Sequence, residues 1–185
     1  MDNIFFDIKQ LRACGDNVII GKTVRIRYPE LVIIGDNCII DDFTYISTAL
    51  NMYNNSHISA GCKLIGGKDS WVIMNRYSTL APGVVLAAGS DDYMNGIATP
   101  TIPAEYKANY QTGTIYLGSH CIIGSNSVVL PHTSFEEGAC LGALSLANGD
   151  YKGYKLYAGI PARYIKDRNK EEILNLQRKY EHTTI

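Results

Sequence analysis

Residues 117–147 read LGSHCIIGSNSVVLPHTSFEEGACLGALSLA, and every sixth position of this stretch holds a hydrophobic residue. These ladder positions are Leu117, Ile123, Val129, Phe135, Leu141 and Ala147. A period of six matches neither the 3.6-residue repeat of a helix nor the alternation of an ordinary strand. Six consecutive matches in one register are a poor fit to ordinary strands with chance spacing. We therefore look for a structure that repeats every six residues.

The same spacing recurs upstream. It gives Ile34, Ile40, Ile46, Met52, Ile58 and Leu64, then Met74, Leu80 and Leu86, and more weakly Cys14, Ile20 and Ile26. A triangular coil accounts for this period, because each hexapeptide supplies a short strand and a bend, and three of them close one turn. Turns that stack by parallel strand pairing bury each other's faces, and no turn is stable alone. The sequence therefore predicts a three-sided prism of parallel strands with the ladder residues inside.

Composition limits the class of protein. The chain has 185 residues, 46% of them hydrophobic and 19% charged, with a formal net charge of −1. Nucleic-acid binders are usually basic, so we expect no nucleic-acid partner. No apolar run reaches the roughly 18 residues of a membrane span, and acidic residues stand where a secretory signal carries basic ones. The five cysteines are odd in number and never closely paired, which predicts reduced core residues in a cytoplasmic protein, with no metal site.

Two interruptions break the ladder. The first inserts a few residues in the segment GGKDSW between Leu64 and Met74. The second lies between Leu86 and Leu117, has no apolar period and is rich in Tyr, Pro, Gly and Asn. Long loops in compact domains are usually functional or disordered. We interpret residues 90–114 as an ordered flap that protrudes from a domain of residues 1–168.

Four motifs resemble those of the hexapeptide-repeat acyltransferases. They are HISA (57–60), SDDY (90–93), TPTIPAEY (99–106) and AGIPARYIKDR (158–168). The pattern is similar to the branch that acetylates sugars for bacterial surface polysaccharides, and within it to enzymes that N-acetylate dTDP-4-amino-4,6-dideoxyglucose. The resemblance implies an all-β fold, a left-handed parallel β-helix of hexapeptide repeats with a protruding loop and a short C-terminal α-helix. The handedness follows from the resemblance and not from the period.

His57 is the candidate catalytic base. Acyl transfer from a thioester requires proton removal from the acceptor, and imidazole titrates near neutral pH. His57 precedes the ladder residue Ile58, so strand alternation points its side chain outward. Related maltose and galactoside acetyltransferases keep a flap histidine at about the place where this chain has Ser90. His120, His132 and His182 lie outside the shared motifs, and the alternative for His57 is a structural or substrate-contacting role.

The flap supplies candidate substrate-binding residues. Asp91 and Asp92 would orient the imidazole, bind the sugar or hold the flap, and the alternative is a solvated acidic turn. Adjacent residues of an extended segment point in opposite directions, so we expect only one of the two carboxylates to face the ligand. The other candidates in the flap are Tyr93, Glu105 and Tyr106.

The resemblance also implies residues that bind acetyl-CoA, the acyl donor. Ser125, Gly142 and Ala143 match the small residues that line the CoA cleft, and an amide near Gly142 or Ala143 is the candidate oxyanion donor. Arg163 and Lys166 would meet the CoA phosphates. For each of these residues an ordinary corner or solvated turn remains the alternative.

Residues 169–185 are predicted as a C-terminal helix and tail. Ile173, Leu176 and Tyr180 have helical spacing, and acidic residues lie early and basic residues late in the segment, which suits the helix dipole. The family's cleft lies between subunits, so the resemblance implies a homotrimer. The expected substrate is a small sugar, namely a nucleotide-linked 4-amino-4,6-dideoxyhexose of lipopolysaccharide O-antigen or capsule biosynthesis.

The sequence leaves other functions open. The acceptor could be a sugar hydroxyl instead of an amine. The chain could also be a non-catalytic scaffold. A carbonic-anhydrase-like zinc site is disfavoured because the histidines lie far apart in the ladder.

Overall fold

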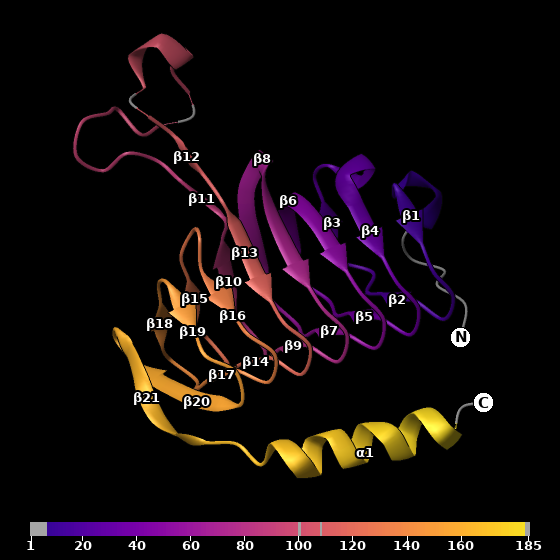
Figure 1. Cartoon of the computed structure of the whole chain (residues 1–185). Coiled ribbons are helices and arrows are strands. Elements are labelled where there is room, and N and C mark those ends of the chain that lie inside the picture. The colour runs from indigo at the N-terminus through magenta and orange to yellow at the C-terminus, as the bar shows by residue number, and fades with distance from the viewer. Residues whose placement is uncertain (1–6, 100, 108, 184–185) are drawn as a thin grey trace.

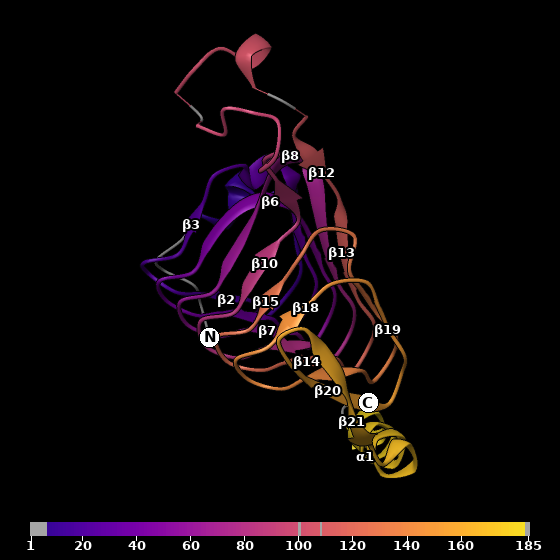
Figure 2. The same ribbon diagram turned by 90° about the vertical axis from the view of Figure 1, so that its left-hand side faces the viewer.

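The computed structural model describes residues 7–99, 101–107 and 109–183, and its strands form a three-sided prism (Figures 1 and 2). Residues 1–6 of the predicted domain and Pro100 of the TPTIPAEY motif lie outside the described residues. Each turn of the chain places one strand on each face, and we number the faces in chain order. The predicted period-six coil of parallel strands is confirmed.

The strands divide among the faces as follows. Face 1 contains β1 (Ala13–Cys14), β4 (Val32–Ile34), the second halves of β6 (Tyr45–Met52) and β8 (Lys63–Met74), β13 (Thr114–Leu117), β16 (Ser134–Phe135) and β19 (Asp150–Tyr151). Face 2 contains β2 (Ile19–Ile20), β5 (Ile39–Ile40), β7 (His57–Ile58), β9 (Thr79–Leu80), β14 (Ile122–Ile123), β17 (Cys140–Leu141) and β20 (Lys155–Gly159). Face 3 contains β3 (Arg25–Ile26), the first halves of β6 and β8, β10 (Val85–Ala87), β15 (Val128–Val129) and β18 (Leu146–Ala147).

The coil is left-handed, as the resemblance implies. In Figure 1 the near strands of face 1 run downward and the chain returns upward behind them along face 3. Successive turns meanwhile advance from the N-terminus at the right toward β20 and β21 (Ala162–Asp167) at the left. Short 3-10 helices precede β1 (η1, Ile8–Gln10), precede β4 (η2, Pro29–Leu31) and lie within the flap (η3, Ala104–Tyr106).

The ladder residues stack in register inside the prism. On face 2 the stack runs through Ile20, Ile40, Ile58, Leu80, Ile123 and Leu141, each paired with the next across parallel strands. Every member is at most 1% exposed. Full burial of such a side chain contributes about 1.5–3 kcal/mol relative to exposure. Because the stack runs through successive turns, the hydrophobic effect and the backbone pairing fix the same register.

Small residues fill the corners of the prism. The position two residues before a ladder residue is buried and holds a cysteine, serine, threonine or alanine in most turns, as at Cys38, Ser56, Cys62 and Cys121. Burial raises the pKa of Cys62 to about 11 and that of Cys121 to about 12. These thiols are therefore protonated packing residues, as the sequence predicted for Cys38 and Cys121.

The first insertion lies at the corner between faces 3 and 1. Thr48 pairs with Gly67 and Ala49 pairs with Trp71, so residues 68–70 have no partner on β6 and bulge outward. Gly67 has a φ of +78°, a conformation that glycine adopts at little cost. The Thr48 hydroxyl donates a hydrogen bond of 2.6 Å to the carbonyl of Ser70 and closes the bulge.

The predicted flap leaves the prism at the same corner. Its base is a two-stranded antiparallel pair of β11 (Gly89–Ser90) and β12 (Gln111–Thr112). The described residues between these strands, 91–99, 101–107 and 109–110, project beyond the prism at the top of both views (Figures 1 and 2).

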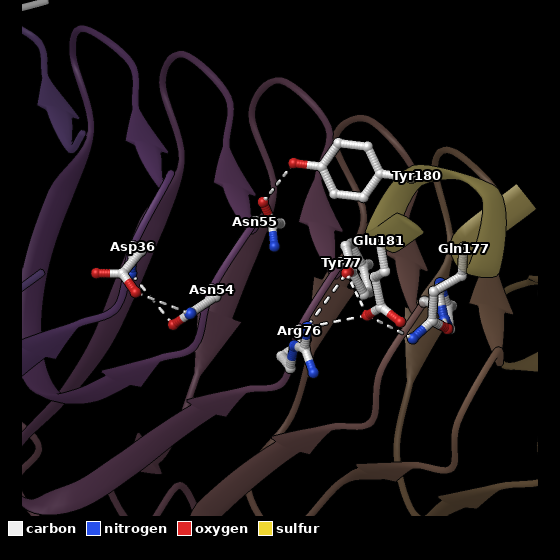
Figure 3. Close-up of polar contacts among 9 residues, drawn as sticks. Asp36, Asn54, Asn55, Arg76, Tyr77, Gln177, Tyr180 and Glu181 are labelled. Carbon is white, nitrogen blue, oxygen red and sulfur yellow. Dashed lines mark hydrogen bonds and ion pairs between the residues drawn. The ribbon is translucent and has the colours of Figure 1, made fainter. Parts of the chain in front are cut away.

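The C-terminal helix α1 (Lys170–Thr183) lies along the corner between faces 1 and 2 (Figure 2). Polar contacts hold it there, since Glu181 accepts hydrogen bonds from Arg76 and Tyr77, and Tyr180 donates one to Asn55 (Figure 3). Gln177 also bonds His120 at 2.7 Å. Leu176 is 54% exposed, so the predicted apolar stripe of the helix is not buried against this chain.

The inward register can be tested with two adjacent isoleucines. Ile123 is fully buried, whereas Ile122 on the same strand is 39% exposed. We expect Ile123→Ala to lower the free energy of unfolding by about 2–5 kcal/mol, and Ile122→Ala by less than about 1 kcal/mol. Urea denaturation of both variants provides the measurement. Equal losses would contradict the assignment of Ile123 to the inside and Ile122 to the outside.

Candidate active site

His57 forms a pair with Asp41 on face 2. Its Nε2 lies 2.9 Å from Oδ2 of Asp41, and the two side chains are 40% and 44% exposed. The parallel pairing of His57 with Ile39 places the ring beside the residues that follow β5, and Asp41 is one of them. The outward direction predicted for His57 is confirmed.

The pair fixes which ring nitrogen can accept a proton. An ionised carboxylate only accepts hydrogen bonds, so the neutral imidazole carries its proton on Nε2, and Nδ1 keeps its lone pair. The hydroxyl of Thr79 lies 3.5 Å from Nδ1, at the long limit of a hydrogen bond. Asp41 also stabilises the imidazolium that forms when Nδ1 takes up a proton. This arrangement suits a general base.

A pocket of about 660 Å³ lies at the root of the flap. Face 3 supplies the floor of the pocket. The first insertion and the flap supply one wall, and Arg27 and Tyr28, which follow β3, supply the other. The lining residues are Arg27, Tyr28, Ser47, Ile65, Gly66, Gly67, Ala87, Gly89, Ser90, Asp91, Tyr93, Tyr110, Leu130 and Pro131. The pocket therefore joins both interruptions of the ladder, and a mainly uncharged floor meets charged and aromatic walls.

The two flap aspartates behave differently. Asp91 lines the pocket, whereas Asp92 accepts hydrogen bonds from the backbone amides of Met94 and Asn95 within its own turn. These bonds hold the pKa of Asp92 below its usual value, and the bond from the Met94 amide has the largest effect. In this chain the carboxylate that contacts His57 belongs to Asp41 and not to either flap aspartate.

The other flap candidates divide in the same way. Tyr93 lines the pocket, although 88% of it is exposed. Glu105 and Tyr106 are exposed on η3, away from the lining residues. Tyr110, which was not singled out from the sequence, donates a hydrogen bond of 2.8 Å to the carbonyl of Gly66. Burial, followed by the charges of Asp91 and Tyr28, raises the pKa of Tyr110, which therefore remains a donor.

The predicted CoA residues meet at the corner between faces 2 and 3. The backbone amide of Leu144 donates to the carbonyl of Ser125, so the corners of two successive turns are in contact. A Cβ atom at Gly124 would lie 2.4 Å from the amide nitrogen of Ala143, so this contact requires glycine. Small residues thus expose the backbone along the corner, as the approach of a thioester requires.

The two candidate oxyanion donors are not equivalent. The Gly142 amide already donates a 2.7 Å hydrogen bond to the Tyr157 carbonyl. No hydrogen bond among the described residues uses the Ala143 amide. The available donor is therefore Ala143.

The predicted basic residues lie on the last hairpin. Arg163 pairs with Ala158, and Ala158 lies beside Gly142, so Arg163 is close to the corner of small residues. Lys166 pairs with Leu156 at the opposite end of β20, nearer α1. The structure brings Arg163 to the predicted CoA corner, but it places Lys166 farther along the strand.

Within one chain, His57 and the flap pocket are separate. His57 projects from face 2, and it is not among the lining residues of the pocket on face 3. Ser125 and Ala143 lie at the corner that joins these two faces, and Leu130 of the pocket follows the same corner by a few residues. The Ser127 hydroxyl donates a hydrogen bond to the Gly142 carbonyl at this corner. At about 3.3 Å per residue, Leu130 lies roughly 10 Å from Ser127, so the pocket begins about that far from the corner.

The residues that the structure describes contain no group of three or more metal-ligating side chains. None of their helices is long and apolar enough to cross a membrane. His120 stacks on Tyr77 and bonds Gln177, and therefore belongs to the contact with α1.

No family model matches the chain. The dTDP-4-amino-4,6-dideoxy-D-glucose acyltransferase of Escherichia coli is 31% identical over 190 residues, which cover 100% of this chain and 96% of that protein. The putative lipopolysaccharide biosynthesis O-acetyl transferase WbbJ of Escherichia coli K12 is 30% identical over 83 residues, which cover 45% of this chain and 42% of WbbJ.

Solved structures agree with this relationship. AntD, an N-acyltransferase from Bacillus cereus, was solved in complex with dTDP and 3-hydroxybutyryl-CoA. It superposes with a TM-score of 0.90 at 32% identity and 99% coverage of both chains. A variant of AntD in complex with dTDP-4-amino-4,6-dideoxyglucose and coenzyme A also superposes with a TM-score of 0.90, at 31% identity. The match covers 99% of this chain and 100% of the AntD chain. A maltose O-acetyltransferase from Clostridium difficile, with a TM-score of 0.60 at 16% identity, covers 88% of this chain and 73% of its own and shares the fold.

The flap anchor provides a test of the pocket's geometry. Tyr110→Phe removes the hydrogen bond to Gly66, and a neutral hydrogen bond of this kind contributes about 1 kcal/mol. We expect limited proteolysis within residues 91–110 to become about fivefold faster, in proportion to the larger open population. Tyr93→Phe is the matched control, since no described contact of its hydroxyl holds the flap. Equal cleavage rates in Tyr110→Phe and the wild type would contradict the anchoring role.

Proposed function

Because the chain belongs to the hexapeptide-repeat acyltransferases, in the group of dTDP-4-amino-4,6-dideoxy-D-glucose acyltransferase, we propose that it transfers an acyl group from an acyl-CoA to the amine of a nucleotide-linked 4-amino-4,6-dideoxyhexose. The specific donor that we propose is acetyl-CoA. The product would enter the synthesis of a surface polysaccharide such as O-antigen or capsule, and the reaction would take place in the cytoplasm.

The observation that carries this proposal is the pairing of two features across face 3. A pocket with the carboxylate of Asp91 in its wall lies at one edge of the face, and the corner with the unpaired Ala143 amide lies at the other. An acceptor with several polar groups suits the pocket, because Asp91 can accept a hydrogen bond from a sugar hydroxyl or amine. A thioester carbonyl suits the corner, because a backbone amide there can stabilise the developing oxyanion.

His57 would complete the chemistry as the base. The neutral amine attacks the thioester carbon, and the lone pair on Nδ1 of His57 receives the proton that the nitrogen must lose. Asp41 holds the ring by Nε2 and stabilises its protonated form. When the carbon–sulfur bond breaks, the protonated His57 returns its proton to the thiolate, so that a thiol leaves, the amide product is neutral and the base is restored.

The separation of His57 from the pocket supports an active site that two copies of the chain share. We propose a homotrimer, in which face 2 of one subunit meets the pocket of its neighbour. His57 would then face the acceptor across the boundary, while Arg163 would lie near the CoA phosphates. Tyr93 would approach the same boundary, since it lines the pocket from the flap.

The test of function is a direct assay. Purified protein is mixed with acetyl-CoA and dTDP-4-amino-4,6-dideoxyglucose, and thiol release is followed together with the mass of the product. We expect one acetyl group per sugar, on nitrogen. dTDP-6-deoxyglucose, which has a hydroxyl at carbon 4, serves as the matched acceptor and should react far more slowly. A faster reaction with the hydroxyl acceptor would identify an O-acetyltransferase, and no reaction with either sugar would refute the proposal.

The role of His57 is tested by substitution. General-base catalysis contributes about 10²–10⁴-fold, so His57→Ala should lower kcat about a hundredfold or more while acyl-CoA binding is retained. Asp41→Asn should lower kcat less, because the base remains but loses its charged partner. His182→Ala, an exposed histidine on α1, is the control. Turnover near the wild-type value in His57→Ala would remove His57 from the mechanism.

A further inference from the structure

Two cations and one aromatic ring form a cluster at the N-terminal side of the flap pocket. The guanidinium of Arg27 lies 5.5 Å from the ring centroid of Tyr28, and the ammonium of Lys68 lies 5.2 Å from the same centroid. Arg27 and Tyr28 both line the pocket. Lys68 is not itself a lining residue, and it reaches the edge of the pocket through its contact with the Tyr28 ring, which attracts both charges.

The first insertion brings Lys68 into this cluster. β3 and β8 are separated by β6, so Arg27 and Lys68 come from turns that are not adjacent. The bulge at residues 68–70 carries the Lys68 side chain back across β6 to Tyr28. Gly66 and Gly67 shape the bulge, and Tyr110 of the flap bonds it. The insertion therefore has a defined structural result, the placement of a second positive charge beside Arg27.

Neither charge is neutralised in the part of the chain that the structure describes. Among the described residues, Arg27 and Lys68 form no ion pair, whereas four other basic side chains do. Arg25 and Lys63, at the outward positions of the same face, are also without a carboxylate partner within the described ranges. Unpaired cations at the rim of a pocket attract an anionic ligand.

Face 3 changes in character along the prism axis. Its basic outward residues lie in the early turns, at Arg25, Arg27 and Lys63, whereas the outward residues Ser47, Ile65, Ala87 and Leu130 of the pocket floor are uncharged. Four strand spacings of about 4.8 Å separate β3 from β15, or roughly 19 Å. A ligand with one anionic end and one uncharged end therefore has a single favourable orientation in the pocket.

We propose that Arg27 and Lys68 bind the diphosphate of the nucleotide-linked sugar, with Tyr28 holding both side chains in place. This inference rests on the proposed function, which requires such a substrate. The hexose then points away from the cations, toward Asp91 and the uncharged floor at Ala87 and Leu130. The orientation directs the amino group toward the corner that carries the Ala143 amide.

CoA also carries phosphates, so the cluster has two conceivable ligands of the same chemistry. The CoA corner lies at the opposite edge of face 3, and its nearest predicted cation, Arg163, lies on the last hairpin. The position of Arg27 and Lys68 in the early turns, beside the flap, favours the acceptor. Binding measurements with each ligand distinguish the two sources.

The test uses isothermal titration calorimetry on the full chain with dTDP, thymidine and CoA as separate ligands. Hydrogen bonds to charged groups suggest that Arg27→Ala and Lys68→Ala should each weaken dTDP binding by roughly tenfold to a hundredfold. The affinities for thymidine and CoA should stay within about twofold of the wild-type values, since neither ligand is expected to contact Arg27 or Lys68. Lys179→Ala, an exposed lysine on α1, is the matched control, and thermal melting verifies that each variant is folded.

Each outcome has a definite meaning. If the variants bind dTDP more weakly and CoA normally, the assignment is supported. If only the affinity for CoA falls, the cluster binds the acyl donor and the assignment is overturned. Unchanged dTDP affinity in both variants, or no dTDP binding by the wild type, would also overturn it. If the wild type binds dTDP through these residues but acylates no sugar, the inference stands and the proposed function fails.

Discussion

Parallel pairing between successive turns is the interaction on which this structure depends. A short strand of two or three residues cannot bury a hydrophobic side chain by itself. Stacked on its neighbours, it places each ladder residue over the previous one, and all ladder residues of face 2 from Ile20 to Leu141 are buried. Because the register determines which side chains point into the prism, it also determines which side chains point outward. The direction of every exposed side chain along the faces follows from this constraint.

The flap pocket lies where the repeat is interrupted. The insertion at residues 68–70 and the flap leave the prism at one corner, and together they form the walls of the pocket. The corner between faces 2 and 3 contains no insertion and has no walls of this kind. Close packing at Gly124 leaves a surface of backbone and small side chains there. A rigid prism thus positions the flap pocket and the corner of small residues on one face.

The fold was predictable from the sequence because the period of six is a global signal. The outward direction of His57 followed from strand alternation. Asp91 and Asp92 also differ, but they lie beyond β11, and hydrogen bonds within its own turn hold Asp92. Asp41 was missed, although it could have been found by aligning the ladder, since the register places it one turn before His57. The roles of Lys68 and Tyr110 could not be found in this way, because both depend on how irregular segments fold back on the prism. The spacing of the stripe correctly predicted the helix α1, but it did not reveal that polar contacts hold the helix on the prism while Leu176 remains largely exposed.

The central claim is that one register places the acceptor pocket and the base on different faces, so that the active site is complete only between two copies. The most direct test is a structure of the protein with dTDP-4-amino-4,6-dideoxyglucose and CoA bound. The account predicts the sugar in the flap pocket of one subunit, with its amine directed at His57 of a second subunit. An amine enclosed by residues of a single chain, or one remote from any copy of His57, would contradict it.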